Sequence, residues 1–96
     1  MPIVEISIVP VGTGSPGVSS YIRAALEVIK KSGLNYSVNP MGTCIQGDWD
    51  KIFETIKKIH DTLADLGCVR MVTTIKIDDR RDKDQTMQEK VARISP

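Results

Sequence analysis

The fold is decided by residues 36–50, Tyr36-Ser-Val-Asn-Pro-Met-Gly-Thr-Cys-Ile-Gln-Gly-Asp-Trp-Asp50. Two short extended runs flank Asn39-Pro-Met-Gly42, where proline presets φ and glycine accepts a positive φ, so this stretch predicts a β-hairpin or a sharp bend within extended chain. Gly47 ends the second run, and Asp48 is a candidate N-cap of the long periodic helix behind it. A strand end, a helix N-terminus and Trp49 therefore meet within three residues, which predicts one wall of a small-molecule site.

The segments on either side of this stretch have clear periodicities. Alternating apolar and polar residues predict strands at residues 3–11, 34–38, 41–46 and 69–78. Apolar residues at helical spacing predict helices from residue 18 to the lysines before Gly33 and at 49–66, where Gly67 stops the second one. Residues 78–84 are all charged and predict a solvated loop, and a short last helix follows it.

The predicted order β-α-β-β-α-β-α places the chain in the α+β class. Its first six elements form the ferredoxin-like split βαβ arrangement, with a four-stranded antiparallel sheet and an additional C-terminal helix. Right-handed crossovers put both main helices on one face of the sheet, within a single domain spanning residues 1–96. The other face is bare, and we expect it to be either wet or used for association; it carries Glu5, Ser7, Val9, Arg70, Val72, Thr74 and Lys76.

Composition excludes several classes of protein. Lys and Arg number 13 and Asp and Glu 12, so the net charge of +1 argues against a dedicated nucleic-acid binder. The two cysteines, Cys44 and Cys68, form no metal-binding spacing and suit a reducing cytosol. No apolar run is long enough to span a bilayer, and the N-terminus lacks the basic region of a signal peptide. We therefore expect a cytoplasmic protein without metal, cofactor or membrane partner.

The stretch Gly12-Thr-Gly-Ser-Pro-Gly17 lies between a predicted strand and a predicted helix. It matches neither the phosphate-loop nor the dinucleotide-binding pattern. Its backbone N–H groups, with Ser15, Ser19 and Ser20, lie where polar ligands are bound at helix N-termini. A strand-to-helix turn capped by serine is the favoured interpretation of this stretch.

Three single residues, His60, Trp49 and Met41, each allow both a packing role and a functional role. His60 is the only histidine and lies beside the apolar stripe of the second main helix, where packing is favoured over catalysis. Trp49 suits a packing role and a ligand wall about equally, and so does Met41. Since no nucleophile–base pair, metal spacing or carboxylate pair emerges, the residues favour binding over catalysis.

Seven short motifs, taken in order, resemble the small YkoF-like thiamine-binding family, long catalogued as uncharacterised. They cover nearly the whole chain: Pro10-Val-Gly-Thr13, Ser19-Ser-Tyr21, Ser32-Gly-Leu-Asn-Tyr36, Asn39-Pro-Met-Gly-Thr43, Gln46-Gly-Asp-Trp49, Gly67-Cys-Val-Arg70 and Ile75-Lys-Ile-Asp-Asp-Arg80. The resemblance implies a ferredoxin-like fold, a homotetramer built from dimers, and non-catalytic binding of thiamine or its hydroxymethylpyrimidine moiety.

The residues of the chain are compatible with such a ligand. Stacking surface is expected from Tyr21, Met41 and Trp49, and hydrogen bonds from Ser19, Ser20, Asn39 and Thr43, with Asp48 near the cation. Two alternatives are an enzyme acting through Cys44 or His60, and a structural or regulatory oligomerisation module that binds no small ligand.

Overall fold

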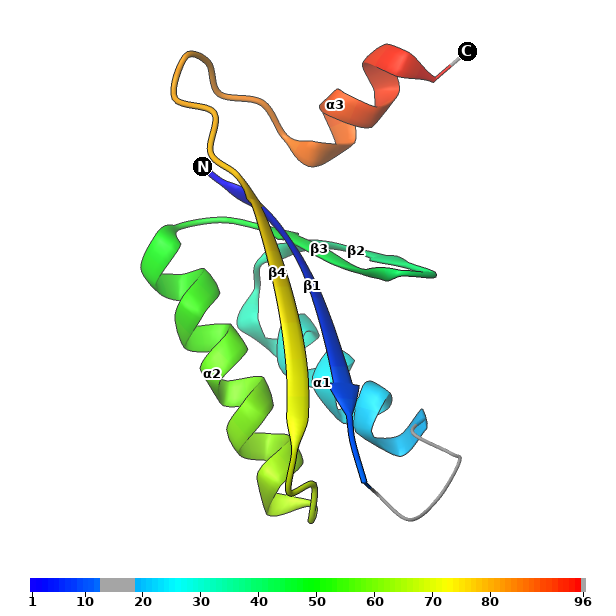
Figure 1. Ribbon diagram of the computed structural model, residues 1–96. Helices are drawn as coiled ribbons and strands as arrows, with labels where there is room; N and C mark the ends of the chain where they lie inside the picture. The colour runs from blue at the N-terminus through cyan, green and yellow to red at the C-terminus, as the bar shows by residue number, and fades with distance from the viewer. Residues whose placement is uncertain (13–18, 96) are drawn as a thin grey trace.

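The computed structural model describes residues 1–12 and 19–95 and confirms the predicted order of elements. Its sheet runs in the order β2-β3-β1-β4 with every neighbouring pair antiparallel, so the ferredoxin-like class is also confirmed. Along the chain (Figure 1) the elements are β1 Ile3–Pro10, α1 Ser19–Ser32, β2 Asn35–Asn39, β3 Gly42–Gln46, α2 Trp49–Asp65, β4 Met71–Asp78 and α3 Met87–Ile94.

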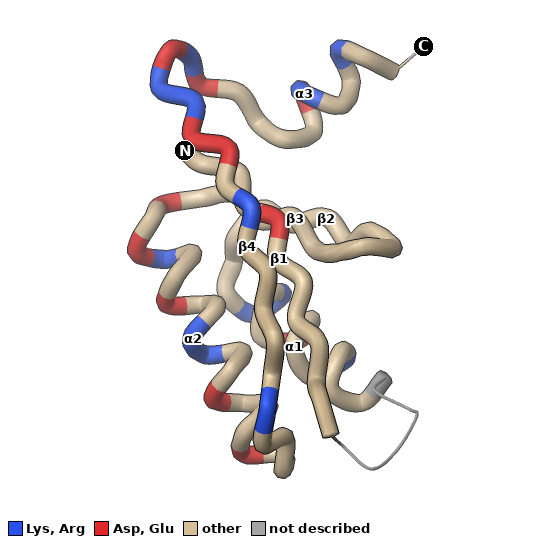
Figure 2. Tube along the Cα trace, viewed as in Figure 1, with Lys and Arg blue, Asp and Glu red and all other residues tan. Residues whose placement is uncertain are grey.

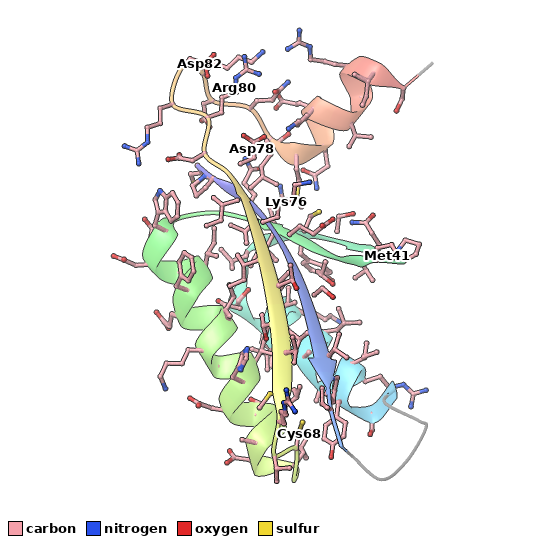
Figure 3. The ribbon with its side chains drawn as sticks, viewed as in Figure 1. Met41, Cys68, Lys76, Asp78, Arg80 and Asp82 are labelled. Carbon is pink, nitrogen blue, oxygen red and sulfur yellow. The ribbon has the colours of Figure 1, made fainter. Side chains whose placement is uncertain are left out.

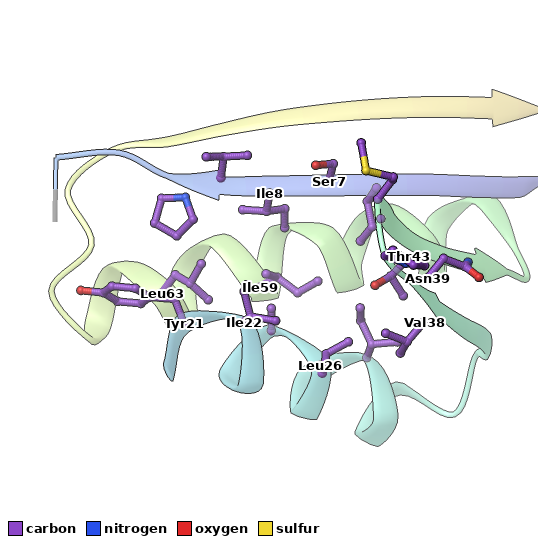
Figure 4. A pocket seen from close by; sticks show the side chains of 18 residues that line it. Ser7, Ile8, Tyr21, Ile22, Leu26, Val38, Asn39, Thr43, Ile59 and Leu63 are labelled. Atoms are coloured by element: carbon purple, nitrogen blue, oxygen red, sulfur yellow. The ribbon is translucent and has the colours of Figure 1, made fainter. Parts of the chain in front are cut away.

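The strand register separates the two faces of the sheet. Val4 pairs with Ile45 on β3 and with Ile77 on β4, so these three side chains share a face. Helices α1 and α2 both lie against this face, as the close view in Figure 4 shows below β1 and β4. The buried core between the sheet and the helices consists of Val4, Ile6, Ile29, Ile45, Ile52, Ile56, Ile59, Leu63 and Cys68.

Two glycines end the main helices as predicted. Gly33 follows α1 with φ 78° and Gly67 follows α2 with φ 101°, a left-handed conformation that favours glycine. β4 begins two residues later than predicted, because the backbone N–H of Cys68 still donates to Leu63 at the end of α2. Most of the glycine-rich stretch and the predicted start of the first helix at residue 18 lie outside the described residues.

The hairpin of β2 and β3 leaves β1 halfway along its length. β1 pairs with β4 from Ile3 to Pro10, but with β3 only from Ile3 to Ile6. Beyond that point the hairpin points away from β1, toward the right of Figure 1. Residues 7–10 of β1 therefore have a neighbouring strand on one side only.

The outer face of the sheet carries the residues predicted for it except Arg70, which precedes β4, and α3 covers one corner (Figure 1). The register places Glu5 beside Lys76 and Val9 beside Val72, away from the main helices. At the corner, the buried side chain of Gln46 donates to the carbonyl of Gln85 at 2.8 Å and accepts from the N–H of Met87 at 2.9 Å. It also donates to the Met1 carbonyl at 3.2 Å, so one amide joins the N-terminus, β3 and α3.

We expect the Gln46→Ala variant to lose roughly 2–4 kcal/mol of unfolding free energy, since the buried N–H of Met87 and the partly buried carbonyls of Met1 and Gln85 lose their partner. The matched control is Gln88→Ala, which removes an exposed amide bonded only to Asn35 and should cost below about 1 kcal/mol. Urea unfolding measures both values. Equal losses in the two variants would contradict a clamping role for Gln46.

Candidate functional site

A cavity of about 310 Å³ lies beside residues 7–10 of β1, where β3 no longer pairs with this strand. Its floor is the edge of β1, one wall is α1, the other wall is the hairpin tip, and α2 closes the back (Figure 4). Small-molecule sites typically measure roughly 300–1,000 Å³, so this cavity has room for one small ring system. It is lined by Ile6, Ser7, Ile8, Val9, Pro10, Tyr21, Ile22, Ala25, Leu26, Ile29, Val38, Asn39, Pro40, Met41, Gly42, Thr43, Ile59 and Leu63.

None of the lining residues is charged, and most are aliphatic. The polar side chains among them are those of Ser7, Tyr21, Asn39 and Thr43. Asn39 is engaged elsewhere, since its amide donates to the Ser37 carbonyl at 3.3 Å and to Cys44 Sγ at 3.6 Å. The Ser7 hydroxyl, the half-buried Thr43 hydroxyl and the Tyr21 phenol therefore remain as side-chain hydrogen-bonding groups for a guest.

The free edge of β1 adds backbone groups to the cavity. Val11 donates its N–H to the Arg70 carbonyl at 2.9 Å, and alternate residues of an antiparallel strand point to the same neighbour. The N–H and C=O groups of Val9 and Ser7 therefore face β4, whereas those of Ile8 face the side that β3 has left. Ile8 thus presents one donor and one acceptor to the cavity without a strand partner.

The structure brings some of the predicted site residues together and separates others. Tyr21, Asn39, Met41 and Thr43 all line the cavity. Met41 is 85% exposed at the hairpin tip, where Figure 3 labels it. Ser20 is exposed on the first turn of α1 and is not among the lining residues, and Ser19 is the residue at which α1 begins.

Asp48 and Trp49 lie beyond the opposite end of β3, in a second hollow of about 530 Å³ shared with the charged loop. Asp48 caps α2 by accepting the N–H of Lys51 at 3.3 Å, as predicted for an N-cap. The Trp49 ring stacks on Phe53 with centroids 6.1 Å apart. This hollow is lined mostly by charged residues, and it shares no lining residue with the cavity at the β1 edge.

The charged loop bordering this second hollow is largely neutralised by its own ion pairs. Arg80 contacts Asp82 at 2.8 Å and Arg81 contacts Asp79 at 2.7 Å, while Lys90 of α3 contacts Asp78 at 2.6 Å. The hydrogen bond from Arg80 lowers the pKa of the Asp82 carboxyl below its usual value. Figure 2 shows how the two signs alternate along this loop above the sheet.

Cys44 and His60 lie on opposite faces of the sheet. Cys44 pairs with Glu5 on the outer face, whereas His60 belongs to α2 and its Nε2 is 2.7 Å from the Thr73 hydroxyl. His60 therefore fastens α2 to β4. Burial, followed by the charge of Glu5, raises the pKa of the Cys44 thiol, and Cys68 is buried as a second free thiol.

The floor of the cavity was missed by sequence reasoning. Residues 7–10 were assigned only to a strand, although two signals in that strand mark a free edge. Strand β1 has eight residues and β3, its neighbour on the hairpin side, has five, so part of β1 must lack a partner on that side. Pro10 also has no N–H, which suits an unpaired position.

The structure is a small α+β fold with an uncharged cavity whose volume is in the range of small-molecule sites. The sequence pattern of a family described as thiamine-binding protein matches residues 4–95. A UPF0045 protein of Staphylococcus xylosus is 43% identical over 98 residues, covering 98% of this chain and 92% of that protein. A UPF0045 protein of Methanothermobacter thermautotrophicus is 40% identical over 91 residues, covering 94% and 92%. The chain belongs to the thiamine-binding protein family.

Solved structures agree with this assignment. A hypothetical protein of Methanocaldococcus jannaschii superposes with a TM-score of 0.87 at 39% identity, covering 97% of this chain and 94% of that one. A Thermotoga maritima protein described as a candidate for thiamine biosynthesis or salvage gives a TM-score of 0.82 at 28% identity, covering 98% of both chains.

The described residues contain neither a metal-binding cluster nor a membrane-spanning helix. Within residues 1–12 and 19–95, no group of three or more His, Cys, Asp or Glu side chains is arranged to hold a metal ion. Within the same part of the chain, the helices are too short or too polar to cross a lipid bilayer.

Alkylation of Cys44 tests the electrostatics of the outer face. Because the pKa of this thiol is raised, its thiolate fraction at pH 8 is low, and iodoacetamide should modify it more slowly than glutathione. Removing the charge in Glu5→Gln lowers this pKa and should speed the reaction, whereas Cys68 should react only after unfolding. Mass spectrometry across pH 7–10 follows both thiols. A Cys44 rate equal to that of glutathione, unchanged in the variant, would contradict this assignment.

Proposed function

We propose that this protein binds thiamine, or its hydroxymethylpyrimidine moiety, in the cavity at the free edge of β1 and does not transform it chemically. The observation that carries the proposal is the unpaired backbone of Ile8 at the floor of an uncharged cavity. Membership of the thiamine-binding protein family and the likeness to the Thermotoga maritima protein support it.

The chemistry of the aminopyrimidine matches this floor. Its amino group donates a hydrogen bond and the adjacent ring nitrogen accepts one. The C=O and N–H of one strand residue offer the complementary acceptor and donor, as a neighbouring strand uses them. The aliphatic side chains of Ile22, Leu26 and Val38 supply apolar surface for the flat ring, and the Thr43 hydroxyl is a further polar contact.

The arrangement of reactive side chains favours binding over catalysis. Cys44 and His60 lie on opposite faces of the sheet, so neither activates the other. Neither residue lines the cavity. An enzyme acting through Cys44 or His60 therefore lacks a nucleophile–base pair at the place where a ligand would be held.

The second candidate function is a structural or regulatory oligomerisation module without a small ligand. Exposed Val9 and Val72 lie side by side on the outer face, which favours association there. We propose a homotetramer built from dimers for either function, and a cytoplasmic location that suits the two free thiols. A ligand-free module predicts a melting temperature that thiamine leaves unchanged.

Thiamine at about 100 times its dissociation constant should stabilise the native protein by about 2.7 kcal/mol and raise its melting temperature. Thr43→Val keeps the shape of the side chain but removes a hydrogen bond, and it should weaken binding by about 1 kcal/mol. Ile22→Trp fills the cavity from its exposed rim and should abolish binding. Calorimetry measures each affinity.

The matched control for these variants is Trp49→Phe, which alters the second hollow while keeping an aromatic ring against Phe53. It should leave affinity unchanged if the cavity is the site. Binding lost in Trp49→Phe but retained in Ile22→Trp would move the ligand to the second hollow. An unchanged melting temperature with every thiamine derivative would favour the ligand-free module.

The tetramer has its own measurement, multi-angle light scattering at micromolar concentration. Replacing Val9 with Lys places a charge beside Val72 on the outer face and should reduce the measured mass. A wild-type protein that elutes with a monomeric mass would contradict the proposed assembly.

A further inference from the structure

One carboxylate borders the uncharged cavity without belonging to its lining. Glu5 is an exposed residue of β1 whose side chain lies on the outer face of the sheet. Its stem folds over Gly42 of the hairpin tip, which does line the cavity. A Cβ atom on residue 42 would stand 3.2 Å from Cγ and 3.6 Å from Cδ of Glu5. Glycine at this position therefore lets the carboxylate approach the rim.

The neighbours of Glu5 leave its charge available. The strand register places Cys44 on one side of it and Lys76 on the other, with Lys76 on β4, across β1 from the cavity. Figure 2 shows this acidic and basic pair side by side where β1 and β4 pass the uncharged hairpin. Among the described residues, no cationic group lies within 4.0 Å of the Glu5 carboxylate, whereas Glu27 and Asp61 both have lysine partners at or within that distance.

The two ends of the cavity differ in electrostatic potential. At its other end, Tyr21 belongs to the first turns of α1, where the helix dipole and the exposed Arg23 contribute positive potential. At the hairpin end, near Thr43, Glu5 contributes negative potential. A guest with a neutral ring and a permanent positive charge is therefore most stable with its charge toward the hairpin and Glu5.

We infer that the Glu5 carboxylate selects cationic ligands at this site, by attracting the thiazolium of thiamine while the neutral pyrimidine occupies the cavity. The inference rests on the proposed function and adds a residue that determines specificity. It predicts that the intact cationic molecule binds more tightly than the pyrimidine fragment, and that Glu5 contributes to this difference.

The test compares two ligands and three variants by calorimetry at pH 8, where the free hydroxymethylpyrimidine is neutral and thiamine keeps its thiazolium charge. Glu5→Gln should weaken thiamine binding about fivefold to tenfold and change fragment binding less than twofold. Glu5→Asp keeps the charge and should retain a preference for thiamine. The charge-matched control Glu54→Gln, on the exposed surface of α2, should alter neither affinity.

Ionic strength provides an independent readout. Raising salt from about 0.05 to 0.5 M screens an exposed charge pair, so wild-type affinity for thiamine should fall while that of Glu5→Gln stays nearly constant. Equal effects of Glu5→Gln on both ligands, or none on either, would overturn the role of Glu5 and leave the proposed function standing. If wild-type protein binds neither ligand, the proposed function and this inference both fail.

Discussion

The cavity depends on one limit in backbone pairing: β1 pairs with β4 along eight residues but with β3 along only four. A central strand normally has both edges occupied, so an unpaired half exposes a donor and an acceptor that another strand can use. Here α1 and the hairpin tip stand on either side of that half and narrow the access to it. The same geometry that shields the edge from strand addition shapes a cavity of small-molecule size.

Close backbone approach at the hairpin tip links the fold to the electrostatics of the rim. A Cβ atom at residue 42 would stand 3.0 Å from the Ile6 carbonyl oxygen as well as close to Glu5, so the close approach of β3 to β1 at this point favours glycine. Once glycine is present, the Glu5 stem folds into the vacant space. The hairpin itself carries no charge, so this carboxylate contributes the fixed charge next to that end of the cavity.

Much of the fold was predictable because each element has a local signal. The alternation of Val4, Ile6 and Ile8 fixed the buried face of β1, and Gly33 and Gly67 marked both helix ends. Phe53 shows the limit of such patterns: it fits the apolar stripe of α2 but is 40% exposed, stacked on Trp49 instead of packed in the core. The clamp at Gln46 was missed because its partners lie about 40 residues away at either end of the chain.

The residues that line the cavity were predictable only in part, because sequence proximity was taken for spatial proximity. Thr43 and Trp49 are six positions apart, but an extended strand advances about 3.3 Å per residue, so β3 carries them to opposite ends of the sheet. Tyr21 and Thr43 are far apart in sequence, yet both line the cavity, because α1 forms one of its walls and the hairpin tip forms another. The floor at Ile8 left no side-chain signal, since its contribution is backbone. A site whose hydrogen-bonding groups are main-chain atoms is specified by where pairing stops, and strand lengths report that better than residue types do.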